Sequence, residues 1–82
     1  MKNLINKFDE IIRWPKKRSE QNTIIEWLSN KFENKRKYSE KEINQIIKKY
    51  HNFSDIPLLR RELISKKYLA RKDNGSEYWK IN

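Results

Sequence analysis

Apolar residues recur at helical spacing in four segments of the chain. The first segment is residues 3–13. Its apolar residues lie at positions i, i+4, i+7 and i+8, which are Leu4, Phe8, Ile11 and Ile12. This spacing predicts a helix over residues 3–13, with Asn3 as its N-cap. The helix should end before Pro15, because proline disfavours the helical conformation of the residue that precedes it.

A basic connector, residues 14–19, leads to a second helix that we expect from about Glu20 to Phe32. Ser19 is its candidate N-cap. The apolar stripe of this helix is Ile24, Trp27, Leu28 and Phe32.

The third helix is expected at residues 40–51. Ser39 and Glu42 have the spacing of a capping box, in which each side chain bonds the backbone N–H of the other residue. Tyr38 precedes the cap and can pack on the helix as a hydrophobic staple. The inward stripe is Ile43, Ile46, Ile47 and Tyr50.

A short connection leads to a fourth helix, which is capped by Ser54 or Asp55 and runs to about Lys67. Pro57 falls in its first turn, where a missing N–H does no harm. The spacing of Ile56, Leu59 and Leu63 turns one face of this helix toward the core.

The end of the chain predicts a β-hairpin around Asn74-Gly75, the strongest short-range signal for a type I′ turn. With this turn at the centre, three cross-strand pairs follow: Lys72 with Glu77, Arg71 with Tyr78, and Ala70 with Trp79. Residues near Tyr38 are candidates for a short third strand beside the hairpin.

This order of elements predicts a mainly α fold with a C-terminal β-hairpin. Two helices joined by a short turn and followed by a hairpin are typical of a winged helix-turn-helix. We expect one domain over residues 1–82, with a winged-helix core at 20–82 and an additional N-terminal helix at 3–13.

The charge of the chain favours a nucleic-acid partner. Its 82 residues carry 20 Lys and Arg against 11 Asp and Glu, a net charge of +9, and such a domain attracts polyanions. Without cysteine, the chain can form no disulfide and no thiolate metal site. No apolar run is long enough to span a membrane, and a cytoplasmic location is expected.

The sequence contains little that favours catalysis. His51 is the single histidine, so a histidine pair for a metal is excluded, and no Gly-rich phosphate loop is present. His51 is expected to cap the end of its helix. We predict no enzymatic activity, no cofactor and no metal.

Arg60 and Arg61 lie in the middle of the fourth helix. Arg61 falls nearly opposite the apolar face, so it is the best candidate for a guanine contact in a major groove. Arg60 borders the core and has a competing role in a salt bridge, with Glu62 or Glu42 as the acid. Ser54 and Ser65 are candidates for phosphate or base contacts.

Further basic residues lie where phosphates run past a winged-helix domain. They precede or open the third helix (Lys35, Arg36, Lys37 and Lys41), occupy the wing (Arg71 and Lys72) or form the basic connector (Lys16, Lys17 and Arg18). The alternative interpretation of these residues is an ordinary solvated surface that contacts no nucleic acid.

The aromatic residues have two interpretations. Trp14, Trp27 and Trp79 are most simply core anchors. Trp79 or Tyr78 could instead stack on bases of a single strand, for which a sheet platform is needed.

Several motifs over residues 14–80 resemble a small bacterial family labelled as a domain of unknown function. The motifs are "WPKKR", "KRKYSEKEIN" and "DIPLLRRELISKKYLARKDNGSEYW". Members of that family occur alone or fused to helix-turn-helix regulators of the arsenic-repressor-like type. The chain departs from its pattern at Trp14, where phenylalanine is usual, and at Leu58, where a small or hydroxyl residue is expected. The resemblance implies a winged-helix-like fold and a link to regulation.

The sequence is compatible with two functions. The first is a transcriptional regulator that binds double-stranded DNA, with helix 54–67 as recognition helix, 71–77 as wing and a possible homodimer. The second is a protein-interaction or dimerisation module that accompanies a transcriptional regulator and contacts a transcription-related partner.

Overall fold

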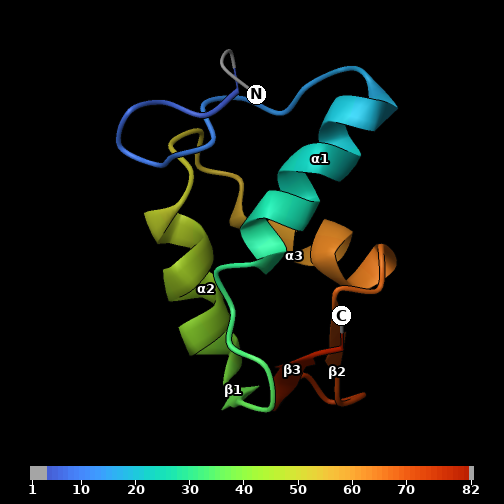
Figure 1. Cartoon of the computed structure of the whole chain (residues 1–82). Coiled ribbons are helices and arrows are strands. Elements are labelled where there is room, and N and C mark those ends of the chain that lie inside the picture. Colours follow the sequence, from blue (N-terminus) through green and yellow to red (C-terminus); the bar gives the residue numbers. More distant parts are fainter. Residues whose placement is uncertain (1–3, 82) are drawn as a thin grey trace.

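The computed structural model describes residues 4–81 and contains three helices and a small sheet (Figure 1). In chain order the elements are α1 (Arg18–Ser29), β1 (Lys37–Tyr38), α2 (Glu40–Lys49), α3 (Ile56–Ser65), β2 (Leu69–Arg71) and β3 (Tyr78–Lys80). Within this part of the chain, no helix has the length and apolar content needed to cross a membrane.

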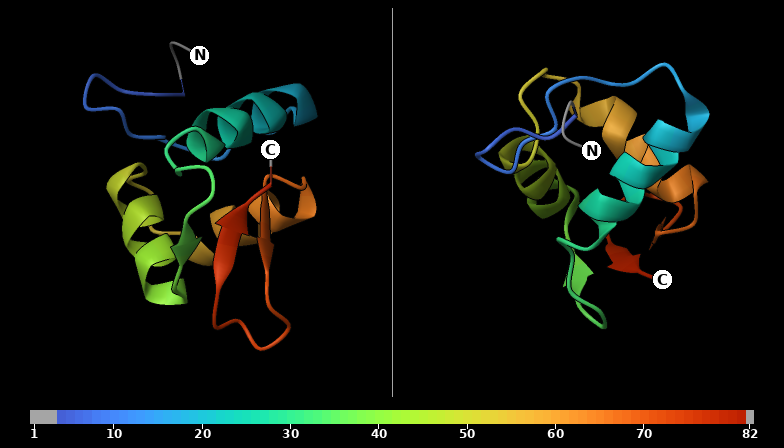
Figure 2. Two further views of the ribbon diagram at one scale, coloured as in Figure 1. Left: turned by 60° about the horizontal axis from the view of Figure 1, so that its bottom comes forward. Right: turned by 45° about the horizontal axis from the view of Figure 1, so that its top comes forward.

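The arrangement is that of a winged helix-turn-helix, as the sequence predicts. Helix α3 packs against α1, α2 and β2. The three strands form one antiparallel sheet in the order β1-β3-β2. In Figure 2 the hairpin of β2 and β3 projects beyond the helices.

The sheet confirms both the hairpin register and the third strand. Ala70 pairs with Trp79 and Arg71 pairs with Tyr78. The N–H of Lys72 donates to the carbonyl of Glu77 at 3.0 Å. Strand β1 supplies the third strand, with Tyr38 opposite Tyr78.

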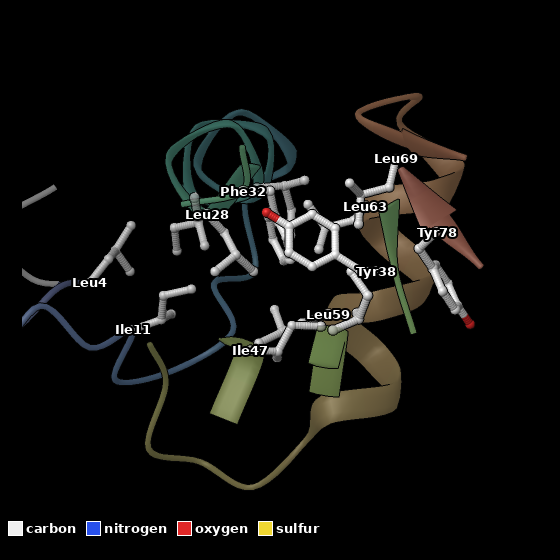
Figure 3. Close-up of a cluster of buried hydrophobic side chains, with 13 residues drawn as sticks. Leu4, Ile11, Leu28, Phe32, Tyr38, Ile47, Leu59, Leu63, Leu69 and Tyr78 are labelled. Atoms are coloured by element: carbon white, nitrogen blue, oxygen red, sulfur yellow. The ribbon is translucent and has the colours of Figure 1, made fainter. Parts of the chain in front are cut away.

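One continuous core joins the helices to the inner face of the sheet (Figure 3). Leu59 and Leu63 of α3 are fully buried, as the helical spacing predicts. Tyr38 closes one side: its ring lies edge-on to Phe32 at 5.6 Å, and its hydroxyl accepts the N–H of Glu33. The buried apolar side chains are Leu4, Ile11, Ile24, Ile25, Leu28, Phe32, Tyr38, Ile43, Ile47, Leu59, Leu63, Leu69 and Tyr78.

The capping box of α2 is present. Ser39 Oγ accepts the N–H of Glu42 at 3.1 Å, and Glu42 Oε1 accepts the N–H of Ser39 at 2.8 Å. The hydrogen bond from the Ser39 backbone N–H to the Glu42 carboxylate, together with the Ser39 side chain and the nearby Arg36, holds the pKa of Glu42 below its ordinary value. The box therefore fixes where α2 begins, directly after β1.

Helix α3 is shorter than the sequence predicts. Asp55 is its N-cap, accepting the N–H of Leu58 at 3.2 Å, while Ser54 lies outside the helix with φ 58°. At the other end Lys67 adopts φ 69°, and the N–H of Tyr68 donates to the carbonyl of Leu63. A residue in the left-handed conformation ends a helix in this way.

The predicted helix at residues 3–13 is wrong for the residues that the structure describes. Asn6 Oδ1 accepts the N–H groups of Phe8 and Glu10 at 2.9 and 3.0 Å, a local pattern that competes with helix formation. Residues 4–13 instead fold back through a bridge between Ile5 and Ile11. The candidate cap Asn3 lies outside the described residues.

Two other expectations about local structure are wrong. Helix α1 begins at Arg18 with Lys17 as N-cap, so Ser19 is already inside the helix; Phe32 lies beyond its end. The hairpin turn is not type I′, which requires a positive φ at both central residues. The N–H of Gly75 donates to Lys72 O, so Asp73 and Asn74 are central; of the turn residues only Gly75 has a positive φ, 74°.

Candidate nucleic-acid interface

The outward face of α3 carries Arg61. Its side chain is exposed, while Arg60 is half-buried on the flank of the helix. Arg60 Nη1 donates to Asn44 Oδ1 at 2.6 Å, which ties α3 to α2. The ion pair of Arg60 with Glu62 or Glu42 is therefore a wrong prediction: Glu62 pairs with Lys66 at 3.2 Å, and Glu42 with Arg36 at 3.3 Å.

A groove of about 470 Å³ separates α3 from the hairpin. Three arginines line it, Arg60 and Arg61 from α3 and Arg71 from β2. Ser65 lies at the same groove from the last turn of α3. Two of the predicted contact regions, the recognition helix and the base of the wing, thus meet at one hollow.

The groove also contains an acid. Glu40, from the first turn of α2, accepts the hydroxyl of Tyr78 at 2.9 Å. Burial raises the pKa of the Tyr78 hydroxyl, and this hydrogen bond to the carboxylate raises it further. One oxygen of Glu40 is thereby occupied from within the protein, and the three arginines leave the groove positive.

The same surface continues along α2. A second hollow beside Ile56 is lined by Glu40, Lys41, Asn44 and Lys48, and a third by Lys48, Ser54 and Ile56. Because neighbouring hollows share residues, they form one surface along α2, α3 and the hairpin. We call it the α3 face; of the predicted site residues it contains Ser54, Lys41, Arg60, Arg61, Ser65 and Arg71.

The turn that sets the angle between α2 and α3 is fixed by His51. This side chain is 5% exposed, and its Nδ1 lies 2.7 Å from the carbonyl of Ile47. The N–H of Asp55 donates to Nε2 at 3.1 Å, so Nε2 is the acceptor and Nδ1 carries the proton. His51 thus caps the end of its helix, as predicted, and also holds the first residue before α3.

Four predicted basic residues lie elsewhere. These residues are Lys35, Arg36, Lys37 and Lys72. Together with Trp79 and Lys80 they line a separate groove of about 300 Å³. The two basic residues of the wing, Arg71 and Lys72, therefore line different grooves. Arg71 pairs with the inward Tyr78, and successive side chains of a strand point to opposite faces of the sheet.

The basic connector lies apart from both grooves. Lys16, Lys17 and Arg18 are exposed at the start of α1, at the end of the molecule opposite the sheet (Figure 1). Residues 4–13 occupy that end too, where Ile11 pairs in parallel with His51. In the part of the chain that the structure describes, the N-terminal segment therefore does not cover the grooves around the sheet.

Sequence reasoning assigned no contact role to two residues of the α3 face, Asn44 and Lys48. Both lie on the side of α2 that carries Lys41, at positions three or four apart, and that spacing is the signal that could have found them. Trp79 is not a core anchor: it lines the second groove, whereas Trp14 and Trp27 pack against the core.

Residues 10–80 match the model of a family described as uncharacterized protein conserved in bacteria (DUF2087). Neither the curated proteins nor the solved structures contain a match to this chain.

Proposed function

This chain belongs to the DUF2087 family of bacterial proteins, and we propose that it binds double-stranded DNA through the α3 face as a transcriptional regulator. The observation that carries the proposal is the alignment of Arg60, Arg61 and Arg71 along one groove between α3 and the hairpin. In winged helix-turn-helix proteins the second helix of the motif enters the major groove.

Each part of the α3 face has a role in the proposal. Arg61 is exposed at the middle of α3 and reads a base edge, since a guanidinium fits the two acceptors of guanine. Lys41, Lys48 and Arg71 flank the helix on both sides and neutralise phosphates, which fixes the position of the domain on the duplex. Arg60 holds α3 against α2 through Asn44.

The proposal is tested by fluorescence polarisation with random-sequence duplex DNA across a salt series. Micromolar binding is expected, and the logarithm of the affinity should fall with the logarithm of salt at a slope of about −3, for the three phosphates that Lys41, Lys48 and Arg71 neutralise. An anionic polymer without bases serves as control and should bind more weakly. Absence of duplex binding at low salt, where charges are least screened, contradicts the proposal.

A second candidate function is a protein-interaction module accessory to a regulator, with a second copy of the chain or a transcription-related protein as partner. It is favoured by apolar side chains on the N-terminal segment: Phe8 is 71% exposed and Ile12 is 36% exposed. This function predicts loss of partner binding on Phe8→Ser with DNA binding unchanged.

A further inference from the structure

The outer face of the sheet carries a groove that the proposed duplex contact does not use. Tyr78 points into the core, so its neighbour Trp79 points to the opposite side of β3. Strand β3 is central in the sheet, which places Trp79 between β1 and β2. The groove around it measures about 300 Å³, at the lower end of the range for small-molecule pockets.

The indole of Trp79 is a platform without a stacking partner. Its cross-strand neighbours are Ala70, whose side chain is a single methyl group, and Lys37. Across residues 4–81, no ring contact or cation–π contact includes Trp79. Trp27, by contrast, lies edge-on to Tyr50 at 6.0 Å with Lys31 Nζ 4.5 Å from its ring centre.

Cations surround this platform. Lys35, Lys37, Lys72 and Lys80 line the groove with a single carboxylate, Glu77. Lys72 and Lys37 both approach Glu77 Oε1, at 3.3 and 3.9 Å. That oxygen is buried and accepts no hydrogen bond, so its charge is balanced by the two ion pairs alone.

Arg36, the fifth cation of the groove, contributes less than the lysines. Its guanidinium hydrogen-bonds to Glu33 at 2.8 Å and to Glu42 at 3.3 Å, and it lies over the ring of Tyr38 at 4.7 Å. The groove therefore has a positive net charge, because four lysines face one carboxylate.

We propose that this groove binds single-stranded nucleic acid, with one base stacked on Trp79 and the adjoining phosphates on the surrounding lysines. A half-buried aromatic ring flanked by cations is the combination that single-strand sites use, because every base has a face to stack and every nucleotide brings a phosphate. The groove lies across the sheet from Arg71 and the α3 face. The inference is therefore independent of duplex binding, and either can fail without the other.

The test is the binding of a fluorescein-labelled oligothymidine to the full chain, compared with the Trp79→Val variant. Valine keeps the strand propensity but removes the platform, and a loss of about ten- to a hundredfold in affinity is expected, as for one stacked base. Trp79→Phe keeps a ring and should retain most of the affinity. Arg18→Ala removes an exposed arginine that lies apart from both grooves and should leave oligothymidine binding unchanged.

A lysine variant tests the phosphate contacts separately. Lys35 has φ 63°, a conformation that asparagine tolerates better than most residues. Lys35→Asn therefore removes the charge without forcing the backbone to change. The salt slope of oligothymidine binding should become shallower by about 0.7, the value for one phosphate of a single strand.

The wild-type protein supplies a readout that needs no variant to fold. In a ¹H–¹⁵N spectrum the indole N–H signal of Trp79, assigned by its absence in Trp79→Phe, should shift on addition of oligothymidine. An unmoved Trp79 signal during binding overturns the proposal, as does full affinity in Trp79→Val. Equally tight binding of polyglutamate also overturns it and would assign the groove to an acidic protein.

Discussion

Replacing Arg61 by alanine is expected to weaken binding to a selected duplex site about five- to 150-fold. This is the effect of losing about 1–3 kcal/mol of base-edge contact. The fold should be unaffected, because the side chain is exposed, no ion pair in residues 4–81 includes it, and alanine is a strong helix former. The measurement is fluorescence polarisation with a duplex obtained by selection from random sequence, with far-UV circular dichroism of the same samples.

Two other arginines serve as matched controls. Arg18→Ala removes an exposed arginine at the start of α1, away from the α3 face, and should change the affinity less than twofold. Arg60→Ala should lower both affinity and stability, the latter by about 1 kcal/mol, because it also breaks the hydrogen bond to Asn44. If Arg61→Ala binds as the wild type does while Arg18→Ala does not, α3 is not the recognition helix.

Replacing His51 by alanine is expected to destabilise the protein by about 2–4 kcal/mol. The substitution leaves the carbonyl of Ile47 and the N–H of Asp55 without their partners and opens a cavity beside Phe53, whose ring lies 4.9 Å from that of His51. For a domain of this size the midpoint of thermal unfolding should fall by about 10 °C or more. Thermal and urea unfolding, followed by circular dichroism, measure the change.

Side-chain amides separate the two hydrogen bonds of His51. His51→Asn places a donor near the position of Nδ1, and His51→Gln places an acceptor near the position of Nε2. Each variant should therefore recover part of the stability that His51→Ala loses. Wild-type stability in His51→Ala would mean that the turn between α2 and α3 does not depend on this side chain. A stable His51→Ala protein with weaker duplex binding would show that His51 only orients α3.

The elements that sequence reasoning predicted correctly have local causes. Ser39 and Glu42 specify the start of α2 by themselves, because both hydrogen bonds of the box lie within four residues. The hairpin register follows equally from a short connection between Lys72 and Glu77. Helical spacing placed Leu59 and Leu63 in the core, since the period of the helix decides which side chains share a face.

The N-terminal segment shows where spacing alone is insufficient. Leu4 and Ile11 are buried, but they reach the core from a folded-back chain, and Phe8 between them is exposed. Two hydrogen bonds from backbone N–H groups to Asn6 Oδ1, and one from the N–H of Ile11 to the carbonyl of Tyr50, replace the helical ones. Tertiary partners and a local polar side chain outweighed a weak helical pattern.

The candidate site was predictable as a list of cations but not as a surface. Arg71 and Lys72 are adjacent in the chain, yet they line different grooves because strand residues alternate between faces. Trp79 follows the same rule, and pairing it with the small Ala70 leaves its ring open instead of buried. The interruption of the basic surface by Glu40 depends on where α2 meets β3, which only the tertiary structure reveals.

The most direct measurement of the central claim is a titration of the ¹⁵N-labelled protein with duplex DNA, followed residue by residue in ¹H–¹⁵N spectra. Duplex binding through the α3 face predicts the largest shifts at Arg60, Arg61, Lys41, Lys48 and Arg71. Signals of Lys16 and Lys17 and the indole of Trp79 should stay in place. Shifts confined to residues 4–18, or to the outer face of the sheet, would contradict the assignment of α3 as the helix that enters the major groove.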